Sequence, residues 1–331
     1  MSRILLEHGG GGRLARELIE AEILPRFAGL VGLPDAASLR ADGRELRFAA
    51  DSFVVQPLEF PGGNIGHLAV HGTVNDLAVA GGRPRWLSLA MIVEEGLPLA
   101  TLRRVLDAVR DAAEDCGVAV VTGDTKVVPR GQCDGLYLST AGVAEALSEL
   151  ILGANRVQEG DAVLVSGPLG DHGMAVLCAR EGFDFGTAPR SDTGPVHRLV
   201  ASIASLGSSI RFLRDPTRGG LAGVLDELAR DVSLAFELEE AALPYAPATR
   251  SVAELLGLEL LHVACEGRVM AVCAPDVADA VLARWRSLPE GAQAARVGVA
   301  RPGPARLILR TALGGRRLID PPRGELLPRI C

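Results

Sequence analysis

Residues 51–98 read DSFVVQPLEFPGGNIGHLAVHGTVNDLAVAGGRPRWLSLAMIVEEGLP, and this stretch decides the fold. After the Pro-Gly-Gly loop at 61–63, apolar residues recur at helical spacing and predict a helix from Ile65 to Ala80. The glycine pair that follows ends this helix. The next apolar run, Trp86 to Val93, predicts a buried strand. A strand, a helix and a strand in this order indicate a unit that mixes α and β structure.

The same alternation extends to both sides of this stretch. It predicts helices from Leu14 to Leu24 and from Leu99 to Cys116, and strands at Glu45 to Ala50, Asp51 to Val55, Val118 to Thr122 and Gly135 to Val143. The structural signals weaken between Ala144 and Gly160. We therefore expect a domain boundary there, with a first domain at 1–150.

A second α/β unit is expected at 151–320. It begins with a strand from Ala162 to Ser166, and a glycine-rich turn leads into a helix that ends at Arg180. The remaining predicted elements are helices at Asp192 to Leu206, Gly219 to Arg230 and Asp276 to Ser287, and strands at Ser233 to Leu238 and Arg268 to Cys273.

The last eleven residues, 321–331, form a tail with three prolines. Proline removes a hydrogen-bond donor and disfavours a helix, so we expect an extended and mobile tail. At about 3.3 Å per residue the tail spans roughly 35 Å. That length is enough to carry Cys331 into a cleft of its own or of a neighbouring subunit.

The composition narrows the class of protein. The chain has 331 residues, 48% of them hydrophobic and 23% charged, which is typical of a soluble protein with about two domains. A net charge of −7 without a basic run argues against general nucleic-acid binding. The sequence shows no apolar window long enough for a membrane span, and it shows no signal segment. We therefore expect a cytoplasmic protein. The six cysteines show no zinc spacing, and we expect all but Cys331 to be buried thiols.

Lys126 is exceptional because the other 33 basic residues are arginines. It could be one surface cation that was retained by chance. Alternatively, a functional site needs a lysine at this position. Lysine differs from arginine because its charge is compact and its pKa shifts readily.

Four aspartates lie where predicted strands or helices meet loops: Asp51, Asp76 beside Asn75, Asp124 and Asp215. Each one alone is explained by helix capping or a turn. Together they indicate a site for Mg²⁺ with a nucleotide, because Mg²⁺ is held by a few carboxylates plus substrate phosphates.

The sequence contains no P-loop motif, so phosphates would be held in another way. A dinucleotide-binding fingerprint is matched only weakly, by the glycines at 10 and 12, Ala15 and the later Asp35. The run at 9–12 is too rich in glycine to make this match informative. The turn with Asp215, Thr217 and Arg218 precedes a predicted helix, where backbone amides can hold a phosphate. The alternative is a capping turn with a surface arginine.

Five segments give the chain a resemblance to a known family. They are the stretch quoted above, VTGDTKVV at 121–128, LVSGPLGDHG at 164–173, RDPTRGGLA at 214–222 and the terminal PRIC. In this order, and over nearly the whole chain, they resemble the HypE family of hydrogenase maturation proteins. The HGGGG run at 8–12 differs from that family in having glycine where serine is common.

The resemblance implies an α+β fold with two α/β domains of the aminoimidazole ribonucleotide synthetase type and a homodimer built on the N-terminal halves. It implies ATP and Mg²⁺ as cofactors, with HypF as the carbamoyltransferase partner and a HypC–HypD complex as the acceptor of cyanide. The implied reaction dehydrates the carbamoylated C-terminal cysteine to a thiocyanate, and the cyanide goes to the iron of a nickel-iron hydrogenase.

The resemblance also implies roles for particular residues. ATP would be bound by Asp51, Asn75, Asp76, Asp124, Asp215, Thr217 and Arg218, and the four aspartates among them would hold the metal. Cys331 would carry the substrate, with Lys126 and Glu266 as a charged pair near its thiol. Glu266 is the candidate base, although which of the two takes the proton stays open.

Two alternatives accompany this interpretation. A sister enzyme such as selenophosphate synthetase would carry its reactive cysteine near the N-terminus, where this chain has none before Cys116. A nucleotide-responsive scaffold would bind ATP without turnover and would use the tail as a docking peptide.

Overall fold

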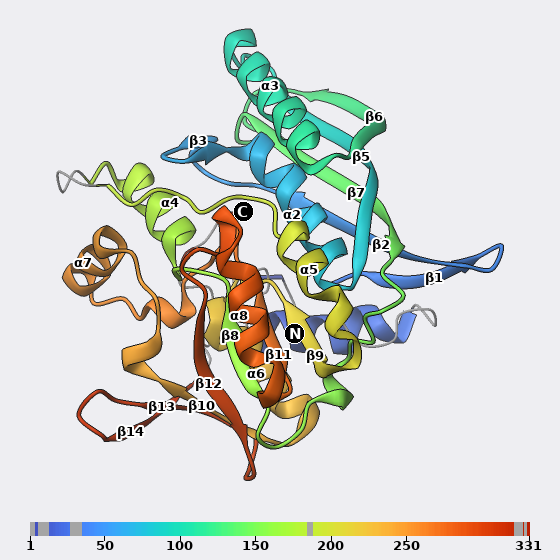
Figure 1. Ribbon diagram of the computed structural model, residues 1–331. Coiled ribbons are helices and arrows are strands. Elements are labelled where there is room, and N and C mark those ends of the chain that lie inside the picture. The colour runs from blue at the N-terminus through green and yellow to red at the C-terminus, as the bar shows by residue number, and fades with distance from the viewer. Residues whose placement is uncertain (1–3, 6–12, 27–34, 184–187, 321–326, 328–329) are drawn as a thin grey trace.

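The computed structural model describes residues 4–5, 13–26, 35–183, 188–320, 327 and 330–331. The chain forms two halves, each built on its own β-sheet (Figure 1). The N-terminal sheet has five strands in the order β1-β2-β7-β5-β6, and the C-terminal sheet has seven in the order β14-β13-β10-β12-β8-β11-β9. The α+β fold class is therefore confirmed.

The N-terminal half contains the stretch that opened the sequence analysis. Its elements are α1 (Arg13–Leu18), β1 (Ala37–Ala41), β2 (Arg44–Phe53), β3 (Glu59–Phe60), β4 (Gly63–Asn64), α2 (Ile65–Val79), β5 (Gly82–Glu94), α3 (Leu99–Cys116), β6 (Ala119–Val128) and β7 (Leu136–Ala146). A π-helical turn (Ile19–Ile23) and a 3₁₀ turn (Leu24–Arg26) continue α1. The predicted helix Leu99 to Cys116 is confirmed at both ends.

Helix α2 is buried along almost its whole length. Asn64 starts it, because its side chain accepts hydrogen bonds from the amides of Gly66 (2.9 Å) and His67 (3.3 Å). The helix packs on β2, β5 and β7 on one side and contacts elements of the C-terminal half on another. A mostly apolar helix that is buried almost all round, as this one is, belongs in a protein core.

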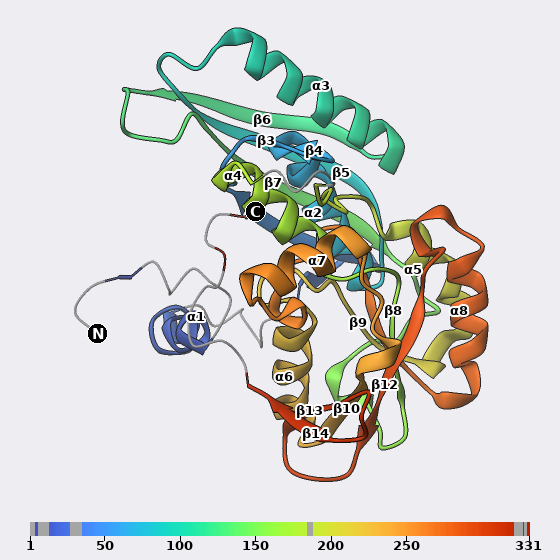
Figure 2. The same cartoon turned by 90° about the vertical axis from the view of Figure 1, so that its left-hand side faces the viewer.

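The C-terminal half is a mixed sheet covered by helices on both faces (Figure 2). Its elements are β8 (Ala162–Val165), α4 (Asp171–Glu181), α5 (His197–Ile203), β9 (Ile210–Arg214), α6 (Gly220–Val232), β10 (Ala235–Glu239), α7 (Pro247–Leu256), β11 (Met270–Cys273), α8 (Ala278–Arg286), β12 (Ala295–Arg301), β13 (Arg306–Arg310) and β14 (Arg316–Ile319). Alternate residues of β8 point to opposite faces, so Val163 packs with the core under α6 and Leu164 with the core under α5 and α8.

A third hydrophobic core joins the two halves. It combines Phe53 and Ile65 of the N-terminal half with Met174 of α4, and it also includes Leu327 and Ile330 near the end of the chain. The C-terminus accordingly lies beside α4, between the two halves (Figures 1 and 2). The end of the chain is thus part of the core that holds the halves together.

Several sequence-based predictions need correction. The two strands predicted within 45–55 are one strand, β2, which stays paired with β7 up to Phe53. The strand expected to end at Thr122 runs to Val128, because its pairing with β5 continues. Strand β5 is only partly buried, with Trp86 46% exposed. The helix predicted from Asp192 begins only at His197, since Pro195 disfavours helical geometry in the residue before it.

Within the described ranges, the helices are too short or too polar to cross a lipid bilayer.

Gly72 of α2 tests the close packing of this helix on β2. A Cβ at Gly72 would lie 2.8 Å from Cζ of the buried Phe53 ring. We expect Gly72→Ala to lower the free energy of unfolding by about 1–3 kcal/mol, measured by urea denaturation, because overpacking outweighs the better helix propensity of alanine. Gly223→Ala in α6, where the nearest atom is at 3.6 Å, is the matched control and should be neutral or stabilising. Equal effects of the two changes would refute this account.

Candidate active site

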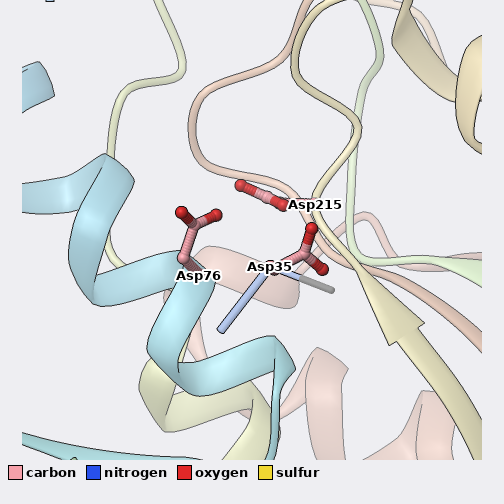
Figure 3. Close-up of side chains that lie close together, drawn as sticks. All are labelled: Asp35, Asp76 and Asp215. Atoms are coloured by element: carbon pink, nitrogen blue, oxygen red, sulfur yellow. The ribbon is translucent and has the colours of Figure 1, made fainter. Parts of the chain in front are cut away.

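Three aspartates converge where the two halves meet (Figure 3). Asp35 precedes β1, Asp76 lies on α2 and Asp215 follows β9, and one carboxylate oxygen of each lies within 4.8 Å of the others. Sequence reasoning predicted Asp76 and Asp215 but considered Asp35 only for a dinucleotide site. No periodic signal marks Asp35; an acidic residue just before a strand is the only hint in the sequence.

Burial and like charge dominate the electrostatics of this cluster. Burial raises the pKa of each of the three carboxyl groups, and the neighbouring aspartates raise the pKa of Asp76 and Asp215 further. Arg214 offsets part of this repulsion through an ion pair with Asp35 at 2.7 Å. A set of hard oxygen ligands with excess negative charge suits Mg²⁺.

Asp51 adds a fourth carboxylate to this environment. It lies in β2, where its side chain accepts a hydrogen bond from the amide of Ser52 at 2.7 Å. Burial raises the pKa of Asp51, and its charge in turn raises the pKa of Asp76 and Glu266. The structure therefore brings Asp51, Asp76 and Asp215 into one electrostatic unit, as the sequence predicted.

A cavity of about 230 Å³ lies against the cluster. Thr217 and Arg218 line it together with Asp35, Asp76 and Asp215. The turn that holds Thr217 and Arg218 leads into the N-terminus of α6, as predicted, and no side chain caps that helix. Backbone amides and a guanidinium beside a cation site form a suitable place for a phosphate group.

Asn75, which was predicted to bind ATP, is hydrogen bonded to backbone groups of the C-terminal half. Its amide nitrogen donates to the carbonyls of Gly194 (3.1 Å) and Glu266 (3.2 Å), and its amide oxygen accepts from the amide of Val196 (2.8 Å). All three bonds go to backbone groups of the C-terminal half. In this structure Asn75 therefore fixes the backbone around Glu266.

Glu266 is the most unusual carboxyl group of the site. Its side chain is buried, and its Oε1 has no hydrogen-bond partner in the described part of the chain. Burial raises its pKa, and the charges of Asp215 and Asp51 raise it further. A buried carboxyl group with a raised pKa is suited to proton transfer near neutral pH.

Asp124 and Lys126 lie apart from this cluster within one chain. Both lie on β6, the outer strand of the N-terminal sheet, where Lys126 Nζ pairs with Asp124 Oδ2 at 2.5 Å. The side chain of Asp124 is 62% exposed, and that of Lys126 is 67% exposed. Because β6 continues past Thr122, these residues lie within a strand and not at its end.

Cys331 is held against other parts of its own chain. Its carbonyl accepts a hydrogen bond from the amide of Val54 at 3.2 Å, three residues beyond Asp51. Its side chain packs against the core that joins the two halves, whereas the other five cysteines are buried. The described end of the tail is therefore docked; most of the tail predicted to be mobile lies outside the described residues.

Comparisons with known proteins show the family of this chain. Two family models match: the N-terminal domain of AIR synthase related proteins at 34–146, and their C-terminal domain at 158–309. Carbamoyl dehydratase HypE from Cupriavidus necator is 44% identical over 99% of this chain and 95% of that protein. Carbamoyl dehydratase HypE from Escherichia coli K12 is 42% identical over the full length of both.

Solved structures extend this similarity. A HypE in complex with ATP superposes with a TM-score of 0.83 and 41% identity, covering 99% of this chain and all of that one. A HypE–HypF complex gives a TM-score of 0.88 at 37% identity, covering 94% of this chain and all of the matched chain. The chain belongs to the HypE family of carbamoyl dehydratases, within the AIR synthase related proteins.

Proposed function

We propose that this chain uses ATP to dehydrate a carbamoyl group on its own Cys331, and so makes a thiocyanate whose cyanide goes to the iron of a nickel-iron hydrogenase. The docking of Cys331 at Val54, just after the strand β2 that carries Asp51, supports this proposal together with the carboxylate cluster of Asp35, Asp76 and Asp215. The relatives named carbamoyl dehydratase and the HypE solved with ATP support it.

The reaction needs ATP because a carboxamide oxygen is a poor leaving group. The oxygen of the thiocarbamate attacks the γ-phosphoryl group, and the bond from the γ-phosphorus to the β,γ-bridging oxygen breaks to release ADP. The C–O bond then breaks with phosphate as the leaving group. Both N–H protons leave, so the products are thiocyanate, ADP, phosphate and a proton.

The residues of the cluster divide this work. Mg²⁺, when bound, supplies positive charge that neutralises the phosphates, and Asp35, Asp51, Asp76 and Asp215 would hold it. Thr217 and Arg218 would position the phosphates at the start of α6. Glu266, with its raised pKa and free Oε1, is our candidate to take an N–H proton.

A homodimer through β6 would give Asp124 and Lys126 a place in this reaction. Strand β6 is an edge strand with nine of its ten residues exposed, including Val121 at 59% and Val127 at 69%. Exposed apolar edge strands are typical of surfaces that pair with another chain. We infer that residues 1–150 form the ATP-binding and dimerisation domain, 151–320 the second domain and 321–331 the reactive tail. In such a dimer Asp124 and Lys126 would complete the partner's site.

Other proteins would supply and use the cysteine adduct. A solved HypE–HypF complex supports HypF as the partner that transfers the carbamoyl group. We propose that a HypC–HypD complex accepts the cyanide, and that these steps occur in the cytoplasm.

The identity of the modified residue can be tested directly by mass spectrometry. After incubation with HypF and its carbamoyl donor, the C-terminal peptide should carry one carbamoyl group on Cys331, and ATP should then remove the mass of one water. Cys331→Ser is the control and should show neither change. Modification of Cys116 or Cys265 instead, or ATP turnover without a carbamoylated tail, would contradict the proposal.

Asp76→Asn tests the metal-nucleotide site. We expect Mg·ATP affinity to fall about tenfold or more in calorimetric titrations, because one ligand of the cluster loses its charge. The melting temperature without nucleotide should stay equal or rise, since the change relieves like-charge repulsion at a buried position. Asp107→Asn on the exposed face of α3 is the matched control. An unchanged titration for Asp76→Asn would remove this residue from the site.

Lys126→Arg tests whether the single lysine is needed as a lysine. We expect the variant to keep its fold and its carbamoylation but to lose at least about tenfold in single-turnover dehydration, or about 1.4 kcal/mol in barrier, because arginine offers neither a compact ammonium nor an exchangeable proton. A wild-type rate would show that Lys126 is only a cation.

Mixing Lys126→Arg with Asp76→Asn tests the dimer. In a heterodimer, one chain keeps a native Asp76 and the other keeps a native Lys126. If Lys126 serves the partner's site, these two residues meet in one of the two sites, and activity returns. If both residues act within one chain, every site keeps one defect, and the mixture stays inactive.

A further inference from the structure

The carbonyl of Ile330, the residue before Cys331, is held by a buried histidine. His172 lies on α4 and is fully buried, and its Nε2 is 2.6 Å from the oxygen of Ile330. Because a carbonyl oxygen can only accept a hydrogen bond, Nε2 is the nitrogen that carries the proton. His172 is thus a donor aimed at the backbone of the tail.

Neighbouring groups fix this form of the ring. Nδ1 of His172 is 2.8 Å from Oγ of Ser191, and this hydroxyl accepts a hydrogen bond from the amide of Thr193 at 3.0 Å. The hydroxyl proton is therefore free to point at Nδ1. Phe60 packs edge-on against the imidazole, with 5.4 Å between ring centroids. Burial lowers the pKa of His172, which favours the neutral ring that this arrangement requires.

Apolar contacts complete the docking site. Leu327 is 8% exposed and Ile330 is 5% exposed, and both pack into the core that joins the two halves. Gly173, next to His172, allows close packing here, since a Cβ there would lie 2.6 Å from Val263 Cγ1 and 3.2 Å from Leu327 Cδ1. These apolar contacts select the tail, whereas the hydrogen bond from His172 sets its depth and register.

The segment that orients His172 also holds Glu266. Next to Ser191, the two carboxylate oxygens of Asp192 accept hydrogen bonds from the amides of Glu266 (3.2 Å) and Gly267 (3.3 Å). The amide of Gly194 donates to the carbonyl of Glu266 at 3.4 Å. One short segment therefore connects the contact with the tail to the backbone of the candidate base.

We propose that His172 is a positioning residue that latches the docked tail by donating from Nε2 to the Ile330 carbonyl, with Ser191 selecting the tautomer. This inference rests on the proposed function only in taking Cys331 as the reactive residue. The latch holds Cys331 beside Val54, against the core that joins the two halves, and through 191–194 it couples this docking to the position of Glu266.

Alkylation of Cys331 tests the latch without ATP or a carbamoyl donor. The full-length protein is treated with iodoacetamide under native conditions, and the rate for each cysteine is followed by peptide mass spectrometry. His172→Phe should raise the rate for Cys331 roughly three- to tenfold, as expected for the loss of one hydrogen bond. His172→Gln, which keeps a donor near the position of Nε2, should restore most of the protection. The five buried cysteines report on the fold.

The matched control is His71→Phe, which removes another buried histidine whose Nδ1 is hydrogen bonded to Thr193 at 3.1 Å. It should leave the rate for Cys331 unchanged. A wild-type rate for Cys331 in folded His172→Phe, or an equal increase in His71→Phe, would overturn the proposal.

A second measurement decides the question if His172→Phe does not fold. Imidazole ¹⁵N spectra of the full-length wild-type protein should show His172 protonated at Nε2, and Ile330→Asp, which places a charge in the apolar site, should shift these signals. Identical His172 signals in both proteins would refute the latch. Neither experiment depends on turnover, so a failed latch and a failed dehydratase are distinguishable.

Discussion

The burial of α2 on every side is the constraint on which the rest of the site depends. A helix between a sheet and a second domain has no solvent to satisfy its polar groups, so each one needs a partner in the protein. Asn75 finds three backbone groups of the C-terminal half and thereby ties the two halves together. Asp76 meets other carboxylates instead. The same helix therefore provides both the support of the site and its unbalanced charge.

That unbalanced charge explains why this place suits a metal and a nucleotide. Carboxylates gathered in a partly buried space repel one another, and Arg214 offsets the charge of only one of them directly. A bound cation would relieve the repulsion and would attract phosphate groups toward the start of α6. The repulsion between these carboxylates destabilises the protein without a cation and would be relieved when a cation binds. Such strained electrostatics are typical of functional sites.

The tail adds an unusual feature, because part of the hydrophobic core consists of the chain end that we propose as the carrier of the substrate. Leu327 and Ile330 contribute apolar area, and the backbone is held at Ile330 and Cys331. Such docking keeps the thiol close to the core that joins the two halves and so raises its local concentration there. The proposed function also requires Cys331 to leave this place, which agrees with the few single contacts that the described residues of the tail make.

Local patterns in the sequence determined the elements that depend on local physics. The helix Leu99–Cys116 is amphipathic and ends at Gly117 in the left-handed conformation, and the apolar run of α2 is followed by two glycines. The aspartates at element edges and the terminal cysteine also pointed to the chemistry. Other features became visible only in the tertiary structure. Asp35 joins the cluster there, and Asn75 supports the backbone around Glu266. The structure also places Asp124 and Lys126 on the edge strand β6 and brings His172 to Ile330. These contacts join residues far apart in the chain, and their partners are set by strand order and domain packing, for which a local pattern carries no signal.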